Sequence, residues 1–235
     1  MLYIAKTKPP RSLLKFIALQ KSADLHPSYK DLRSPYINDL DALLYEQQKG
    51  LCCYCMQVLP TDARKRTREH FLPESHFKQE EVNYYNLYLA CTEKDGTNAG
   101  HCDKTKANIL ISKYIGHPNC EDFFKYNEDG EILPKKLGYE EWEKFKGSNK
   151  VDIFETSPET AEILATISIL NLNSKTLKQK REKFILTFKT MLNSIDNEQD
   201  CQRLIDKYKS FGHQNPKPFA GVARYFLKER LKTLS

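Results

Sequence analysis

The chain has 235 residues, of which 40% are hydrophobic and 29% are charged. This length and composition exclude a disordered chain and fit one large domain or two small ones. The mean hydropathy of -0.65 excludes a body embedded in a membrane, and no apolar run reaches the roughly 20 residues that span a bilayer. The N-terminal apolar stretch is too short for a signal peptide, so we expect a cytoplasmic protein. The net charge of +6 is compatible with a polyanionic partner without requiring one.

The first predicted element is a helix that leads into a cysteine-rich stretch. Ser34 and Pro35 suit a helix cap and a first helical residue, the leucines of NDLDALL share one helical face, and Gly50 lies where the helix would end. We therefore predict an N-terminal part, residues 1–50, that consists of a leading segment and this helix.

The second part, residues 51–112, contains most of the side chains that can carry chemistry. Short strand-like stretches lie around residues 69–72 and 87–90, with polar loops between them. A helix is predicted to begin near His101 or Cys102. The pattern indicates a small unit of strand, loop, strand and helix.

The remaining sequence divides into two further parts. Residues 113–156 are rich in Gly, Asp, Asn and aromatic side chains, and we predict an irregular connector there. From residue 157 onward apolar residues recur at helical spacing, so we predict a helical region over residues 157–235. Such stripes usually fill a core, and we assign no cofactor to them.

Four of the seven cysteines have the spacing of a metal site. Cys52 and Cys55 form a CxxC pair, and Cys91 and Cys102 can complete a tetrahedron of thiolates around a structural zinc ion. Cytosolic thiols stay reduced, which favours metal binding over disulfides. The alternatives are four unrelated buried cysteines, or a thioredoxin-like redox pair that leaves the last two cysteines without a role.

The other three cysteines are not expected to bind the metal. Cys53 interrupts the CxxC pair, and it could replace Cys52 only with a strained CxC geometry. Cys120 and Cys201 are predicted to be ordinary core thiols.

Polar residues of a second kind lie between and beside the cysteine pairs. Glu69 and His70 stand together in the stretch TREHFLPES, Asn86 precedes the second strand, and Asp103 directly follows the fourth cysteine. A lone histidine in such a place is usually a partly buried structural residue. A zinc frame would bring the two carboxylates together, however, and carboxylate oxygens are ligands that Mg²⁺ prefers.

The segments CCYC, REHFLP, NLYLAC and CDKTK occur in the order found in HNH endonucleases of the ββα-metal class with a four-cysteine zinc frame, and the chain resembles that family. The match covers about 60 residues. Further along, LNLNSKTLKQKR at residues 170–181 is similar to a signature of the PtuB-type HNH subunits of Septu and retron-associated anti-phage systems. The resemblance implies an α+β, mostly helical fold, in which a small zinc-stabilised ββα-metal core lies between an N-terminal helix and a C-terminal helical body.

The resemblance also implies roles for single residues in metal-dependent hydrolysis of phosphodiester bonds. His70 would be the general base, and Glu69 a ligand of a catalytic Mg²⁺ or Mn²⁺ ion. Asn86 would orient His70 and pin its loop. Asp103 stands where the family usually has Asn or His, and it would be the second protein ligand of the ion.

Two features depart from the family pattern: Asp103 itself and the spacing of the last two cysteines. The last two zinc ligands, Cys91 and Cys102, are separated by the insert TEKDGTNAGH, which is longer than the usual spacing. His101 or Asn98 from this region could therefore replace Asp103 as the second ligand of the catalytic ion.

Basic residues flank the predicted ion site on both sides. We expect Arg68, Lys104 and Lys106 to contact substrate phosphates, and Lys106 matches a basic position of the family. The basic residues at 64–66 are either a solvated loop or part of the same phosphate-binding surface.

The resemblance implies nucleic acid, DNA or RNA, as substrate, and no membrane partner. It also implies two partners: a PtuA-like ATPase subunit and a retron reverse transcriptase with its RNA–DNA product. Two other functions remain open: a zinc-stabilised module that only binds nucleic acid or protein, and a degenerate HNH subunit that serves as an adaptor. The discriminating feature is the Glu69–His70 pair, which a binding module does not need.

Overall fold

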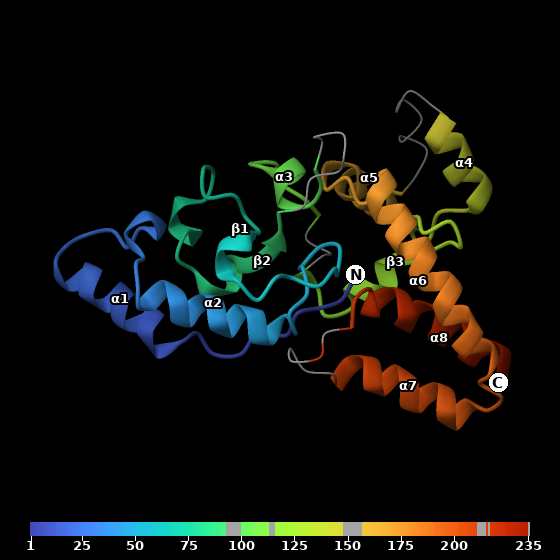
Figure 1. Cartoon of the computed structure of the whole chain (residues 1–235). Helices are drawn as coiled ribbons and strands as arrows, with labels where there is room; N and C mark the ends of the chain where they lie inside the picture. The colour runs from blue at the N-terminus through green and yellow to red at the C-terminus, as the bar shows by residue number, and fades with distance from the viewer. Residues whose placement is uncertain (93–99, 113–115, 148–156, 211–214, 216, 235) are drawn as a thin grey trace.

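The computed structural model describes residues 1–92, 100–112, 116–147, 157–210, 215 and 217–234. These residues form an α+β, mostly helical fold, as the sequence predicts, with two separate two-stranded sheets. In Figure 1 the N-terminal helices and the first sheet lie on one side, and the C-terminal helices lie on the other.

The N-terminal part contains two helices, α1 (Arg11–Ser22) and α2 (Tyr36–Gln47), which pack against each other. Helix α2 is the predicted helix, and it ends shortly before Gly50, whose φ is +68°. Helix α1 is not predicted, although it buries Leu13 and Phe16 on one face. The signal that marks it is the Pro-Pro pair immediately before its first turn.

The first sheet is an antiparallel hairpin of β1 (Arg66–His70) and β2 (Leu87–Cys91). Glu69 pairs with Tyr88 and His70 pairs with Leu87. The first strand therefore begins and ends earlier than predicted. The short helix α3 (Asp103–Lys106) follows β2 and starts one residue after Cys102. The order of strand, loop, strand and helix is the one that the sequence indicates.

The prediction of an irregular connector is wrong for much of residues 113–156. Strands β3 (Phe124–Tyr126) and β4 (Ile132–Pro134) form a hairpin, and α4 (Tyr139–Gly147) follows it. The hairpin turns at Gly130, whose φ of +72° suits glycine. Buried aromatic side chains on both elements supply the burial that stabilises such short pieces.

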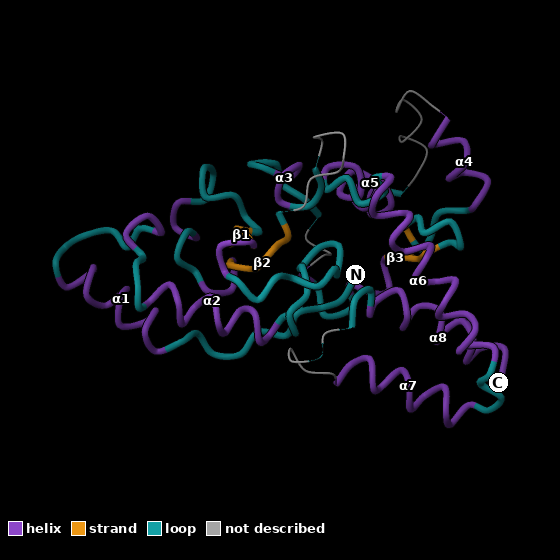
Figure 2. Tube along the Cα trace, viewed as in Figure 1, coloured by secondary structure: helices purple, strands orange, loops and turns teal. Residues whose placement is uncertain are grey.

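The C-terminal region is helical, as predicted, and its elements are α5 (Pro158–Ile169), α6 (Lys175–Asn193), α7 (Glu198–Ser210) and α8 (Ala220–Leu234). Ser157 and Ser174 cap α5 and α6 by accepting a hydrogen bond from a backbone N–H in the first turn. Helix α8 packs against both α6 and α7, and Figure 2 shows these helices beside the smaller strand elements.

None of the described helices is long and apolar enough to cross a lipid bilayer.

The segment 170–181 connects the C-terminal helices to the rest of the molecule. The backbone N–H of Cys102 donates a 2.9 Å hydrogen bond to the carbonyl of Leu170, and the side-chain amide of Asn171 donates a 2.9 Å bond to the carbonyl of Gly100. The buried guanidinium of Arg181 donates 2.6 Å bonds to two further carbonyls, one of them in the β3–β4 turn. Much of this segment therefore has a structural role.

Candidate active site and metal centre

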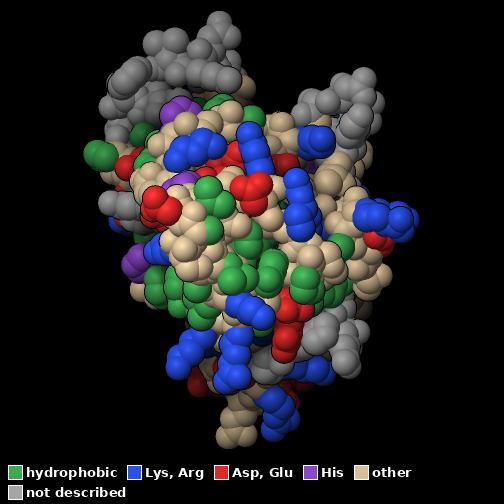
Figure 3. Space-filling model, turned by 90° about the vertical axis from the view of Figure 1, so that its left-hand side faces the viewer, with side chains coloured by type: hydrophobic (Ala, Val, Ile, Leu, Met, Phe, Trp, Pro, Cys, Tyr) green, Lys and Arg blue, Asp and Glu red, His purple; other side chains and the backbone are tan. Residues whose placement is uncertain are grey.

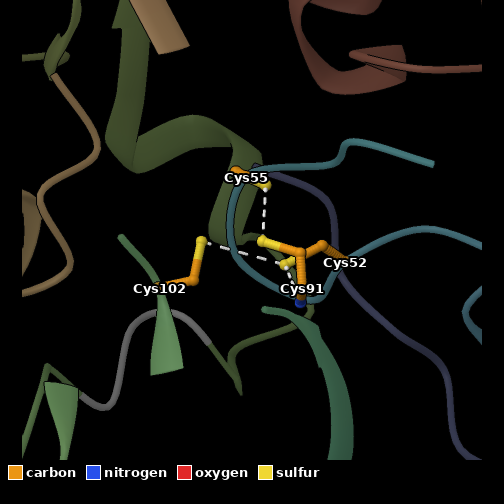
Figure 4. Close-up of side chains that lie close together, drawn as sticks. All are labelled: Cys52, Cys55, Cys91 and Cys102. Atoms are coloured by element: carbon orange, nitrogen blue, oxygen red, sulfur yellow. Dashed lines mark hydrogen bonds between the residues drawn. The ribbon is translucent and has the colours of Figure 1, made fainter. Parts of the chain in front are cut away.

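Four cysteines meet in a cage. Cys52 and Cys55 lie in the turn after α2, Cys91 ends β2, and Cys102 precedes α3. Their thiol groups point toward one another (Figure 4), and all four sulfur atoms lie within 4.8 Å of one another.

The sulfur positions fit a single zinc ion. The Sγ atoms of Cys52 and Cys102 are 3.8 Å apart, and those of Cys55 and Cys91 are 3.7 Å apart. Four sulfurs bound at 2.3 Å to a tetrahedral zinc ion would lie about 3.8 Å from one another. All four side chains are buried, as expected for a closed structural site. Burial and the neighbouring thiols raise the pKa of Cys102 well above its usual value, so zinc binding must displace protons.

The remaining cysteines and His101 occupy different positions. Cys53 is buried but does not belong to the group of four thiols, and neither do Cys120 and Cys201. The Nδ1 atom of His101 lies 3.2 Å from the Sγ atom of Cys102. His101 therefore lies against the cysteine cage, and Asn98 falls outside the described residues.

Glu69 and Asp103 come together, one from β1 and one from the start of α3. The Glu69 side chain is buried, and its Oε1 atom lies 2.7 Å from the ammonium group of Lys106 and 2.9 Å from the hydroxyl of Tyr54. The pKa of Glu69 is raised to about 8. The main cause is burial, the second is a hydrogen bond with the Asp103 side chain, and the nearby Lys106 only partly offsets them. A divalent cation would relieve this crowding of negative charge, and the oxygen donors suit Mg²⁺ or Mn²⁺.

His70 is the last residue of β1, and its side chain is 11% exposed. Its Nε2 atom lies 2.9 Å from the carbonyl oxygen of Glu81. A carbonyl can only accept, so Nε2 carries the proton and Nδ1 carries the lone pair. The ring of Tyr29 packs edge-on against the imidazole, with 4.8 Å between the ring centroids. Within the described residues Nδ1 has no hydrogen-bond partner, which leaves it able to accept a proton.

Asn86 fixes the loop that joins the two strands. Its Oδ1 atom accepts a 2.7 Å hydrogen bond from the N–H of Leu72, and its amide donates to the carbonyls of Leu72 at 3.0 Å and Glu80 at 3.2 Å. These bonds hold the segment on either side of the imidazole. The direct contacts of the His70 ring come from Glu81 and Tyr29 instead.

The predicted phosphate-binding residues differ in their exposure. Lys104 is exposed. The Arg68 side chain is 30% exposed, and its guanidinium donates to the Asp41 carboxylate at 3.1 Å and to the Tyr29 hydroxyl at 2.8 Å. Lys106 is 1% exposed, and besides Glu69 it binds the carbonyl of His70 at 2.9 Å. In this structure Lys106 therefore contacts the predicted catalytic residues themselves.

The basic run at 64–66 divides between the surface and the interior. Arg64 is exposed and pairs with Asp62 at 3.0 Å. Arg66 is buried, pairs with Asp41, and lies over the ring of Tyr45. Arg66 is therefore a structural residue here.

Several residues near the site are missed by the sequence analysis. Tyr54 lies inside the CxxC pair, and its place between two ligands is a signal that could have found it. Tyr29 and Glu81 contact His70 but belong to none of the recognised motifs, so only the structure identifies them.

The charge on the face that carries α1 is mixed. Figure 3 shows hydrophobic side chains in the centre of this face and Lys and Arg side chains gathered toward its lower end, with acidic side chains among the basic ones above. Attraction for a polyanion on this face must therefore come from local groups of basic side chains.

A cavity of about 540 Å³ lies elsewhere, behind the turn that holds Cys52 and Cys53. None of the predicted catalytic residues lines it.

No family model matches the chain. The chain is similar to a protein of Escherichia coli that is described as the proposed HNH endonuclease of retron Ec83. The two are 27% identical over 219 residues, which cover 81% of this chain and 77% of the relative. The similarity extends well beyond the cysteine-rich middle and supports a relationship to the HNH nucleases.

Proposed function

We propose that the protein is a metal-dependent HNH endonuclease that hydrolyses phosphodiester bonds in nucleic acid. The observation that carries this proposal is the arrangement of three side chains. The carboxyl groups of Glu69 and Asp103 are in contact, and His70, the neighbour of Glu69 on the same strand, has an Nδ1 atom without a partner in the described part of the chain. A general base and two acidic metal ligands are the minimal set for metal-assisted hydrolysis, and Lys106 contacts both the Glu69 carboxylate and the His70 carbonyl.

The residues have distinct roles in the proposed reaction. His70 accepts the proton of the attacking water through Nδ1, while the carbonyl of Glu81 holds the other ring nitrogen. Glu69 and Asp103 would hold the divalent cation, which would stabilise negative charge on the phosphate and on the leaving oxygen. Lys104 contacts a substrate phosphate.

The decisive experiment is a cleavage assay with labelled DNA and RNA in Mg²⁺ or Mn²⁺. We expect His70→Ala to lower the cleavage rate by about 10²-fold or more, because general-base catalysis contributes that much. His76→Ala is the matched control, since His76 follows the same strand but is exposed, and within the described residues its side chain hydrogen-bonds only to Ser75. Equal cleavage by His70→Ala and wild type would reject the assignment of the base.

A zinc-stabilised adaptor without catalytic activity is the second candidate. Two observations favour it: the ring of His70 is only 11% exposed, and the Glu69 carboxylate is already paired with Lys106. An adaptor predicts zinc in the purified protein, no cleavage with any divalent cation, and unchanged binding of nucleic acid by Glu69→Gln.

The biological setting is proposed from the resemblance and from the relative. The name of the relative places that protein in a retron, and the segment 170–181 is similar to PtuB-type subunits. We infer an effector nuclease of an anti-phage complex with a PtuA-like ATPase and, in a retron setting, a reverse transcriptase with its RNA–DNA product. Co-expression with a PtuA-like ATPase followed by size-exclusion chromatography tests this, and separate elution would contradict it.

A further inference from the structure

Two buried donors, from residues that neighbour the four cysteines in the sequence, contact one oxygen atom of Glu69. The Tyr54 hydroxyl donates a 2.9 Å hydrogen bond to Oε1, and the ammonium group of Lys106 lies 2.7 Å from the same atom. Tyr54 stands between the thiols of Cys52 and Cys55, and Lys106 is four residues after Cys102. Glu69 therefore contacts one residue next to the first cysteine pair and one residue shortly after Cys102.

The hydrogen bond between Tyr54 and Glu69 is buried in the protein interior. The Tyr54 side chain is among the largest fully buried ones in the described chain, with 2% exposure, and Glu69 is 3% exposed. A buried hydroxyl needs a hydrogen-bond partner, and this one uses the carboxylate that is predicted to bind the catalytic ion. Its bond limits rotation of the carboxyl group and, like the contact with Lys106, is made to Oε1 and not to Oε2.

We propose that Tyr54 is a positioning residue that couples the cysteine cage to the divalent-cation site through Glu69. The inference rests on the proposed function, because it assigns Glu69 to the ion. Hydrogen-bond partners of a ligating carboxylate orient it, and their loss typically weakens metal affinity by about 10- to 100-fold. Lys106 contacts the same oxygen, so two residues that neighbour the predicted zinc ligands in the sequence hold Glu69.

Tyr54→Phe removes the hydroxyl and keeps the ring. We expect Mn²⁺ binding, measured by calorimetry on the zinc-loaded protein, to weaken about tenfold, while zinc content by mass spectrometry stays equal to that of the wild type. Cleavage at subsaturating Mn²⁺ should slow by a similar factor. Tyr45→Phe is the matched control, because it removes a hydroxyl that donates to the carbonyl of Leu59 at 3.3 Å and should leave Mn²⁺ affinity unchanged.

The outcomes are separable from those of the nuclease proposal. Wild-type Mn²⁺ affinity in Tyr54→Phe would overturn the inference, and so would loss of zinc or of folded structure, which would show that the hydroxyl serves the cage alone. In the double variant with Glu69→Gln, the inference expects Tyr54→Phe to cause no further loss of Mn²⁺ affinity, and a full additional loss would overturn it. If the wild type cleaves nothing, the proposed function fails, but the Mn²⁺ titrations still decide the role of Tyr54.

Discussion

At the scale of single residues, the fold disfavours the charged form of Glu69. Burial and the contact with Asp103 raise its pKa from 4.5 to about 8. Between these two values the unfolded chain has lost the proton and the folded chain keeps it, so stability falls as the pH rises. Below about pH 4.5 the carboxyl is protonated in both states and this contribution is fully present.

We therefore expect the free energy of unfolding, without added divalent cation, to fall with pH between about 4.5 and 8. The slope from this one group is at most about 1.4 kcal/mol per pH unit. Urea titrations of the wild type and of Glu69→Gln measure it as a difference, and Mg²⁺ should reduce that difference by neutralising the carboxylate. Parallel pH profiles of the two proteins without Mg²⁺ would contradict the expectation.

Asp41 is a second residue whose environment allows a prediction. Its buried carboxylate pairs with the guanidinium of Arg66, whose side chain is 5% exposed, and with that of Arg68 at 3.1 Å. Asp41→Ala leaves a buried cation without its partner, so we expect a loss of about 3 kcal/mol in the free energy of unfolding. Arg64→Ala removes an exposed ion pair and should change stability little. Similar denaturation midpoints for the two variants would refute this difference.

At the scale of elements, helix α8 packs closely against the turn that follows Cys55. A Cβ atom added at Gly221 would lie 2.7 Å from the Sδ atom of Met56 and 2.9 Å from the carbonyl oxygen of Met1. The close approach places α8 next to Met56, the residue that follows Cys55.

Gly221→Ala should consequently destabilise the protein by about 1 to 3 kcal/mol, because the added methyl group overpacks this contact. Gly116→Ala is the control, since nothing lies within 4 Å of the corresponding Cβ position. Thermal unfolding of both variants checks this, and a Gly221→Ala protein as stable as the wild type would show that α8 can move away from the turn.

At the scale of the whole molecule, the cysteine cage connects segments that are far apart in the sequence. Its ligands come from the turn after α2, the end of β2 and the start of α3. If zinc holds these segments together, chelation should lower the thermal midpoint of the whole protein, and Cys55→Ser should do the same. Cys201→Ser should leave the zinc content unchanged, because that thiol bonds to the carbonyl of Leu227 in a separate cluster.

Zinc release should also depend on pH. Because the thiols must lose protons to bind the ion, zinc affinity is expected to fall as the pH is lowered. Measuring free zinc with a chromophoric chelator across a pH series tests this. Release that does not change with pH would argue against a site made of four thiolates.

The sequence predicts those parts of the fold that depend on residue spacing and periodicity within one segment. Cysteine spacing predicted which thiols meet, and apolar periodicity predicted the C-terminal helices and α2. The β3–β4 hairpin lies in the segment predicted to be an irregular connector. Its strands have only three residues each, and their stability comes from packing on helices that are distant in the sequence.

The candidate site shows the same division. The contact between Glu69 and Asp103 follows from the order of the motifs, whereas the partners of the imidazole, Tyr29 and Glu81, depend on how separate loops fold back. The interior position of Lys106 could not be predicted either, because a lysine beside a predicted phosphate site is usually expected to face solvent.

The hydrogen bond from Cys102 to Leu170 has a mechanical consequence. It joins Cys102, the residue before Asp103, to the residue that follows α5. The side chain of Asn171 adds a second bond, to the carbonyl of Gly100. A displacement of the C-terminal helices would therefore be transmitted through these two hydrogen bonds to Cys102 and to Asp103 at the start of α3.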